Sequence, residues 1–289
     1  MPAGGREETE VPAATTAALT CPVRGCGAAL SRLGTVWSCA RAHAFDEARS
    51  GYLNLLQPQD RRSKHPGDSK EAAQARRRLA DRGLEDGMRD ELLRELDALP
   101  GSGSRAVLDV GCGEGFLAGA LAALRPVEAH GIDISVPAIE LAAKRYPRVR
   151  WVVGNADRTL PWADGSFDLV LSITARRNGP EMRRVLKSTG RLVLAVPGHD
   201  DLAELREALL GHATERDRAA SAIEELAADF ELLSRRMLGR KANLTRPEIR
   251  DLLTATYRGG RVSESERASG IGDLEVTISR QLLVFAAKG

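Results

Sequence analysis

Four side chains near the N-terminus of this 289-residue chain have the types and spacing of a metal site. Four residues separate Cys21 from Cys26, twelve separate Cys26 from Cys39, and three separate Cys39 from His43. Three thiols and an imidazole form a ligand set that a tetrahedral structural Zn²⁺ takes. Four protein ligands leave no open position, so we expect the metal to fold a segment too small for its own core. Reduced cysteines in a metal-free loop are the alternative.

A second group of residues could bind a nucleoside-containing ligand. A glycine-rich loop follows the apolar run 106–110; the residues of interest are Asp109 within the run and Gly111, Gly113, Glu114 and Gly115 in the loop. Glycines at the carboxyl end of a first strand let the backbone approach a ligand closely. Asp133 follows 22 residues after Gly111, where a carboxylate can accept hydrogen bonds from both ribose hydroxyls. The loop reads G-x-G-x-G rather than the dinucleotide pattern G-x-G-x-x-G; a structural glycine turn and a NAD site are the alternatives.

A basic segment lies between these two groups. Residues 61–82 hold eight Lys or Arg against three acidic residues, a local charge of +5 within a chain whose net charge is only +2. Such a patch can attract the phosphates of a nucleic acid, although a solvated helix face has the same composition. The candidates for RNA contact are Arg61, Arg62, Lys64, Arg76, Arg77 and Arg78.

The pattern of apolar residues predicts the elements that must position these groups. Strands are expected over 106–110, 129–133, 149–153, 167–173 and 191–196, with a last strand over 274–285. Helices are expected over 116–124 and 136–145, over 70–79 and 88–99 ahead of the glycine loop, and near 201–210, 217–228 and 246–256. Strands alternating with helices predict an α/β fold, a doubly wound parallel sheet with helices on both faces.

Composition narrows the class of protein. Apolar residues make up 43% of the chain and charged residues 28%, which is typical of a globular protein. The chain has no run of about 18 apolar residues, so we expect no membrane span. Its first twenty residues lack a basic start and an apolar run; we therefore expect no secretory signal, a cytoplasmic location and reduced cysteines.

Residues 105–197 resemble the class I S-adenosylmethionine (SAM)-dependent methyltransferases. The resemblance rests on the glycine loop, on Asp133, on Gly154-Asn155-Ala156-Asp157 after the third strand, and on Phe167-Asp168-Leu169-Val170. It implies that the glycine loop meets the methionyl part of SAM and that Asp133 meets the ribose. Asn155, Ala156 and Asp157 would then lie near the adenine.

The order of motifs along the chain resembles a narrower family, the bacterial 23S ribosomal RNA guanine-N1-methyltransferases. The cysteine block is followed by Gly51-Tyr52-Leu53-Asn54-Leu55-Leu56, by Pro66-Gly67-Asp68-Ser69 and by Gln74-Ala75-Arg76-Arg77. This resemblance implies a zinc-bearing RNA-recognition domain, often a homodimer, and methylation of guanine N1 in a hairpin of 23S rRNA. Some members protect producers of macrolides, which suggests antibiotic resistance. A small-molecule methyltransferase that keeps the zinc block as a scaffold is the alternative function.

The chain departs from this family at three places. Glu85 stands where a Tyr is expected to touch the cofactor, Ala175-Arg176-Arg177-Asn178 replaces an Ala-Pro, and Asn243–Pro247 replaces a Met-Thr-Pro. Asp201 aligns with a cofactor-contact position of the family, and a helix N-cap is its alternative role. His199 is read as a loop histidine, so no general base is assigned.

Together these features predict four segments. They are a disordered tail (1–19), a zinc-binding RNA-recognition domain (20–56), a basic loop with a helical connector (57–104) and a SAM-dependent methyltransferase domain (105–289).

Overall fold

The computed structural model describes residues 17–61, 66–101, 103–211, 217–256 and 270–289. Arg62, Lys64 and residues 1–16 of the expected tail lie outside these ranges. Residues 17–19 are ordered, because Leu19 is buried and forms a bridge with Trp162. None of the helices within the described ranges is long and apolar enough to cross a membrane.

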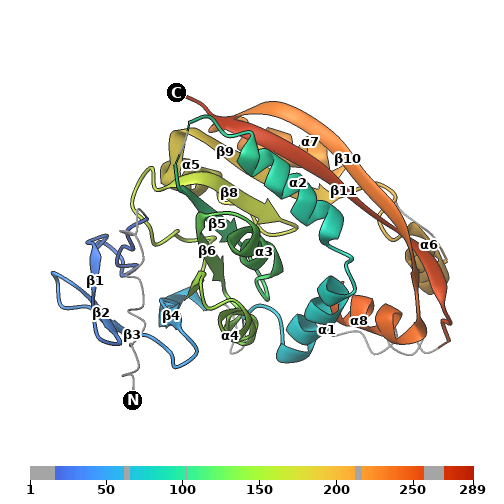
Figure 1. Cartoon of the computed structure of the whole chain (residues 1–289), viewed down its shortest axis with the longest axis horizontal. Coiled ribbons are helices and arrows are strands. Elements are labelled where there is room, and N and C mark those ends of the chain that lie inside the picture. The colour runs from blue at the N-terminus through green and yellow to red at the C-terminus, as the bar shows by residue number, and fades with distance from the viewer. Residues whose placement is uncertain (1–16, 62–65, 102, 212–216, 257–269) are drawn as a thin grey trace, which may run out of the picture.

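One mixed sheet organises the molecule (Figure 1). Its order is β10-β11-β9-β8-β5-β6-β7-β4, in which the central strands are parallel and β11 and β10 run antiparallel at one edge. The central strands are β5 (Arg105–Val110), β6 (Val127–Asp133), β7 (Arg150–Val153), β8 (Phe167–Ile173) and β9 (Leu186–Pro197). The expected α/β sheet and its five central strands are confirmed.

Helices cover both faces of this sheet, since its strand residues are apolar on both sides. Met88 and Leu92 of α2 (Asp86–Asp97) pack with Val107 and Leu169, while Met182 of α5 (Gly179–Val185) packs on the opposite face. The other helices that flank the sheet are α3 (Phe116–Leu124), α4 (Val136–Arg145), α6 (Ala203–Leu210) and α7 (Arg218–Leu226). The predictions for α3 and α4 match at both ends.

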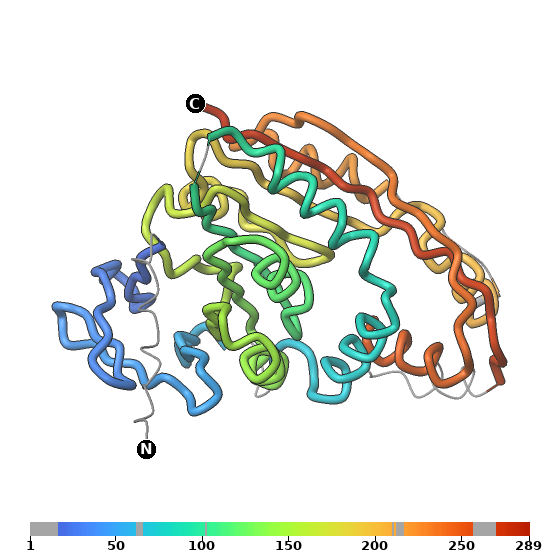
Figure 2. The backbone as a smooth tube through the Cα atoms, viewed as in Figure 1, coloured from blue at the N-terminus to red at the C-terminus, as the bar shows by residue number. Residues whose placement is uncertain are grey.

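Two long strands form the edge farthest from the N-terminal unit. β10 (Phe230–Leu244) pairs along its whole length with β11 (Leu274–Ala287), and Figure 2 shows the two running side by side. α8 (Arg246–Thr256) follows β10 and packs against α1 (Lys70–Asp81). The last strand was expected; β10 and α5 were not.

The N-terminal unit is a small sheet of β1 (Leu30–Leu33), β2 (Val36–Cys39) and β3 (Ala44–Asp46). The chain then forms β4 (Tyr52–Asn54), which pairs in parallel with β7 and so extends the large sheet. The 3₁₀ helix η1 (Pro58–Asp60) leads toward α1. Residues 52–54, expected within the zinc unit, therefore lie in the large sheet.

Candidate functional site

The four N-terminal metal-ligand candidates lie together. Cys21 and Cys26 flank the turn before β1, Cys39 ends β2, and His43 precedes β3. Their ligand atoms all lie within 4.8 Å of one another. Cys26 Sγ is 3.7 Å from Cys39 Sγ, and His43 Nδ1 is 3.4 Å from Cys21 Sγ and 3.5 Å from Cys39 Sγ. Tetrahedral zinc bonds require about 3.8 Å between sulfurs and about 3.6 Å between sulfur and nitrogen, so this donor set fits Zn²⁺.

The glycine loop joins β5 to α3 by a turn that only glycine can make easily. Gly115 is the N-cap of α3 and has φ +82°, in the left-handed region. A Cβ at this position would lie 2.4 Å from the Trp151 ring and 2.8 Å from the Ala142 methyl group. The loop is therefore held close against β7 and α4.

Asp133 fixes the relative position of this loop and the next strand. At the end of β6, its Oδ2 accepts a hydrogen bond from Gly113 N (3.0 Å) and its Oδ1 accepts one from Ser135 N (2.8 Å). Burial raises the pKa of Asp133, while these two N–H groups oppose the rise. The carboxylate is thus orientated before any ligand arrives.

Two further carboxyl groups are buried here, Asp109 near the end of β5 and Glu114 within the loop itself. Burial raises the pKa of Asp109 to about 7, and the nearby charges of Glu114 and Asp133 add to the effect. Burial also raises the pKa of Glu114 to about 7, although Arg76 Nε lies 3.9 Å from its carboxylate; Glu85 adds to the rise. Both carboxyl groups are therefore partly protonated near neutral pH.

A cavity of about 710 Å³ opens at this edge of the sheet, within the size range of small-molecule sites. Six of the ten predicted cofactor residues line it, namely Gly111, Asp133, Asn155, Ala156, Asp157 and Asp201. The other four, Asp109, Gly113, Glu114 and Gly115, are buried and lie outside the cavity lining. A carboxylate at the end of β6 and a glycine at the end of β5, both lining one cavity, fit a nucleoside-containing ligand such as SAM.

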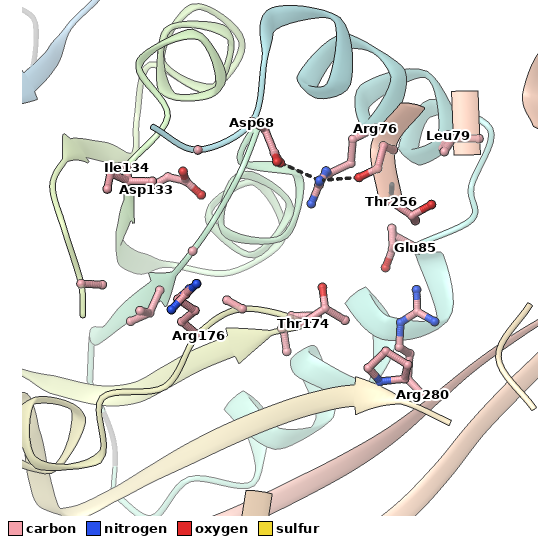
Figure 3. A pocket seen from close by; sticks show the side chains of 18 of the residues that line it. Asp68, Arg76, Leu79, Glu85, Asp133, Ile134, Thr174, Arg176, Thr256 and Arg280 are labelled. Carbon is pink, nitrogen blue, oxygen red and sulfur yellow. Dashed lines mark hydrogen bonds and ion pairs between the residues drawn. The ribbon is translucent and has the colours of Figure 1, made fainter. Parts of the chain in front are cut away.

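The connector from the zinc unit borders this cavity. Asn155 Nδ2 donates to the Asp60 carbonyl (2.9 Å), and Ser135 Oγ donates to the Asp68 carbonyl (2.6 Å). Figure 3 shows Asp68 and Arg76 pairing above the cavity, where Arg76 Nη2 is 2.7 Å from Asp68 Oδ2. Sequence reasoning singled out Pro66–Ser69 as a motif without assigning Asp68 a place in the site.

The opposite end of the cavity is built from residues far apart in the sequence. In Figure 3, Glu85, Thr256 and Arg280 lie away from Asp133 and Ile134. Asp201 Oδ1 accepts hydrogen bonds from Ser279 N (2.9 Å) and Arg280 Nη1 (2.5 Å). The N-cap interpretation of Asp201 is wrong, because Leu202 is the N-cap of α6 and makes no side-chain cap. Sequence reasoning missed Arg280, which no local motif marks.

His199 is exposed and is not part of the described cavity lining, as expected for a loop histidine. Arg176 lines the cavity 3.4 Å from Asp157 and is exposed. Asn243 and Leu244 end β10, and Arg246 and Pro247 begin α8, so this departure from the family pattern falls at the junction of the two.

The basic candidates divide by position. Arg61 is exposed, and Arg77 is half-buried near Tyr146. Arg76 lines the cavity, whereas Arg78 points to α8 and makes a two-bond ion pair with Asp251 at 2.6 and 2.7 Å. Of the four candidates that the structure describes, Arg76 and Arg78 are therefore bound to acidic groups of the chain itself.

Comparison with known proteins adds relatives of defined activity. A family described as "Methyltransferase domain" matches residues 107–194, and one described as "RlmA, N-terminal" matches residues 19–64. A 23S rRNA (guanine(748)-N(1))-methyltransferase of Streptomyces fradiae is 33% identical over 268 residues, which cover 90% of this chain and 94% of that protein.

More distant similarities cover only part of the chain. A phthiotriol/phenolphthiotriol dimycocerosates methyltransferase of Mycobacterium tuberculosis is 37% identical over 128 residues, 43% of this chain and 47% of that protein. The structure of a TehB-like SAM-dependent methyltransferase from Corynebacterium glutamicum covers 75% of this chain and 96% of its own, with 21% identity and a TM-score of 0.44.

Proposed function

The chain belongs to the family of 23S rRNA (guanine-N1)-methyltransferases, and from this premise we propose that it methylates N1 of one guanine in a hairpin of 23S rRNA. It is a SAM-dependent enzyme with a structural zinc site. One observation carries the proposal: the connector that leaves the zinc unit also lines the cofactor cavity, through Asp68, Arg76 and Glu85. An RNA held by the zinc unit would therefore lie beside the cavity.

The chain's own residues would divide the work by their place in the cavity. When bound, SAM supplies a methyl group carried on a sulfonium, and the sulfur becomes a neutral thioether once the methyl group is transferred. Asp133 would accept the ribose hydroxyls, and Asn155, Ala156 and Asp157 would surround the base of the cofactor. Guanine N1 lies on the Watson–Crick edge, so the target base has to be unpaired or turned out of its stack. Much of the acceleration would come from holding N1 about 3–3.5 Å from the methyl carbon.

The zinc unit and the basic connector would grip the RNA backbone. The exposed Arg61 and the half-buried Arg77 are the described candidates of the basic segment that make no hydrogen bond or ion pair to a described acidic side chain. Phosphate contacts of this kind position an RNA without reading its sequence. We assign the segments accordingly: residues 20–56 to zinc binding and RNA recognition, 57–104 to the connector, and 105–289 to methyl transfer.

The test is methyl transfer from labelled SAM to protein-free 23S rRNA that lacks the modification, with the position read by primer extension. A methyl group on N1 blocks Watson–Crick pairing, so reverse transcriptase should stop at one base in a hairpin loop. Asp133→Ala serves as the impaired control and, at a SAM concentration near the wild-type Kd, should give a much weaker stop. No incorporation into RNA or ribosomal subunits would contradict the proposal and favour a small-molecule acceptor.

We further propose that the modification protects a cytoplasmic ribosome from a macrolide-type antibiotic. The support is the resemblance to a family with such members. Expression in a susceptible strain should raise the inhibitory concentration of the drug, and Asp133→Ala should not. A homodimer remains part of the proposal, and sedimentation of the zinc-loaded protein with and without RNA would test it.

A further inference from the structure

The cavity offers few groups that could take a proton from guanine. Guanine N1 carries a hydrogen, which has to leave as the new N–C bond forms. The described lining contains no His, Lys, Cys or Tyr. Its possible proton acceptors are carboxylates, and these are Asp68, Glu85, Asp133, Asp157 and Asp201.

Four of these carboxylates are already bound by the protein. Asp68 pairs with Arg76, and Asp133 accepts from the N–H groups of the glycine loop and α4. Asp157 lies 3.4 Å from Arg176, and Asp201 accepts from Arg280 and the backbone of β11. These four carboxylates therefore already accept from, or lie beside, donors of the protein itself, and a guanine N–H would have to compete with those donors.

Glu85 differs from the other four. Within the described part of the chain its carboxylate receives no hydrogen bond and no ion pair, and its side chain lines the cavity. Figure 3 shows it at the end that also holds Thr256 and Arg280, away from the ribose-orientated Asp133. An unpaired acceptor at the end opposite the nucleoside part of the cofactor is placed for the group that receives the methyl.

The backbone beneath Glu85 is fixed by the end of α1. Gly83 has φ +82° and donates to the Ala80 carbonyl (2.8 Å), while Leu84 N donates to the Leu79 carbonyl (3.1 Å). These two bonds form a Schellman motif, and Leu84 and Leu79 are buried in the same apolar cluster, a contact that often accompanies this motif. Arg240 Nη1 also donates to the Gly83 carbonyl (3.1 Å), which ties the turn to β10. The turn therefore presents Glu85 to the cavity from a rigid base.

We propose that Glu85 is the catalytic residue that reads the target guanine and accepts its N1 proton; this role rests on the proposed function. Guanine presents two donors on its Watson–Crick edge, N1–H and N2–H, and one carboxylate can accept both. Adenine presents an acceptor at N1, which a carboxylate repels. The same side chain thus selects guanine and removes the hydrogen that blocks N1.

The step balances without any additional reactant. The N1–H bond breaks and its proton passes to the Glu85 carboxylate. The electron pair left on N1 forms the bond to the methyl carbon, and the pair of the broken C–S bond stays on sulfur. Glu85 keeps its hydrogen bond to the N2 amino group, so the base remains orientated while the carboxyl moves clear of N1.

The test compares Glu85→Gln with Glu207→Gln, a matched substitution on the exposed surface of α6, outside the described cavity lining. At saturating SAM and RNA, Glu85→Gln should turn over about 100-fold more slowly than the wild type, the usual contribution of a general base. SAM affinity, measured by titration without RNA, should change by less than about 3-fold because Glu85 lies away from Asp133. Glu207→Gln should match the wild type in both assays.

A second measurement uses binding rather than turnover. An RNA hairpin with inosine in place of the target guanosine lacks the N2 amino group; the wild type should bind it about 10-fold more weakly in the absence of SAM. Glu85→Ala, which has no side-chain acceptor, should bind the two RNAs with nearly equal affinity. If Glu85→Ala does not fold, equal binding of the two RNAs by the wild type contradicts the role by itself.

The outcomes separate this role from the proposed function. Wild-type enzyme that marks the guanine, beside a Glu85→Gln variant as fast as Glu207→Gln, overturns the role of Glu85 alone. A loss of SAM affinity in Glu85→Gln would instead make Glu85 a cofactor-binding residue. Wild-type enzyme that marks no guanine overturns the proposed function, and the role of Glu85 with it.

Discussion

Asp133 is expected to have two roles. Its carboxylate is the group expected to bind the ribose, and it also links two segments of the fold by hydrogen bonds. Its two oxygens accept from Gly113 N and Ser135 N, so it joins the glycine loop to the first turn of α4. Removing such an acceptor leaves buried N–H groups without a partner, which costs about 1–3 kcal/mol. Ligand binding and local stability are therefore coupled at this side chain.

Asp133→Ala should lower SAM affinity by about 100-fold, the value of hydrogen bonds to a charged group. It should also lower the free energy of unfolding by about 1–3 kcal/mol while the chain still folds. Titration calorimetry and urea unfolding measure the two effects. Glu224→Ala, on the exposed face of α7, is the control and should change neither. Retained affinity in Asp133→Ala would remove the ribose role.

The buried carboxyl groups predict how stability depends on pH. Asp109 and Glu114 have pKa values of about 7 in the folded chain, raised by burial from 3.8 and 4.5. Between about pH 4 and 7 the folded chain therefore holds protons that the unfolded chain has released. Their contribution is fully present below about pH 4, falls as the pH rises and is lost above about pH 7.

Asp109→Asn should flatten this dependence. A shift of about three pKa units corresponds to about 4 kcal/mol, so the variant should lose less stability than the wild type between pH 4 and 7. Urea unfolding at steps of half a pH unit measures the slope. Asp90→Asn, on α2, serves as the control and should keep the wild-type slope. Equal slopes for all three proteins would mean that Asp109 is ionised in the folded chain.

α1 is the element that brings charge, packing and the cavity together. Ser69 caps its first turn by accepting from Ala72 N (3.2 Å), and Ala72, Ala73 and Leu79 face the interior. Arg76, Arg77 and Arg78 follow one another and so point in different directions around the helix. The three arginines therefore do not form one basic surface, and their substitution should affect RNA binding and stability to different degrees.

Arg61→Gln and Arg77→Gln should each weaken RNA binding and reduce its salt slope by about one. Arg78→Gln should change RNA affinity little and instead lower stability by about 1 kcal/mol or less, since its partner Asp251 holds α1 to α8 across a partly exposed pair. Filter binding at several salt concentrations, together with thermal unfolding, distinguishes the two effects. A weaker salt slope in Arg78→Gln would show that this ion pair opens for RNA.

Local sequence predicted the elements whose patterns are strong. The helices over 116–124 and 136–145 show apolar periodicity and a recognisable N-terminus. The first begins after Gly115, and the second begins with Ser135 as N-cap and a proline in its first turn. β10 was missed because Leu, Arg, Lys and Ala favour helix locally, and its strand form depends on pairing with β11. The glycine loop could be located from sequence because it is a local motif. Arg280 could not, because it reaches the cavity only through the order of strands in the sheet.

At the scale of the whole molecule the zinc unit and one face of the large sheet share one buried apolar cluster. Leu19, just before the unit, and Trp37 within it belong to the same cluster as Val152, Trp162 and Phe167. Thr20 N also donates to the Pro161 carbonyl (3.0 Å), so the backbone crosses the boundary as well. Loss of order in the unit would therefore expose apolar surface of the sheet.

Cys39→Ser should release the zinc and lower the midpoint of the main thermal transition by about 5–10 °C, rather than melt the N-terminal unit alone. Metal analysis and calorimetry measure both. Cys112→Ser is the control, because Cys112 is buried in the glycine loop outside the zinc cluster; it should keep about one zinc per chain. An unchanged main transition in zinc-free Cys39→Ser would mean that the unit folds independently.

The position of β4 also affects the order in which the chain can fold during synthesis. Tyr52–Asn54 pairs with residues that are translated about 100 residues later, and Leu19 meets Trp162 over a longer interval still. The N-terminal unit can acquire its metal early, but the surface that it packs on is complete only after β7, Trp162 and Phe167 have left the ribosome. During that interval the apolar face around Trp37 is exposed to solvent. A chaperone, or a slowly translated stretch before β7, would then act on a chain whose N-terminal unit is folded but not yet docked, and so change the yield of active enzyme.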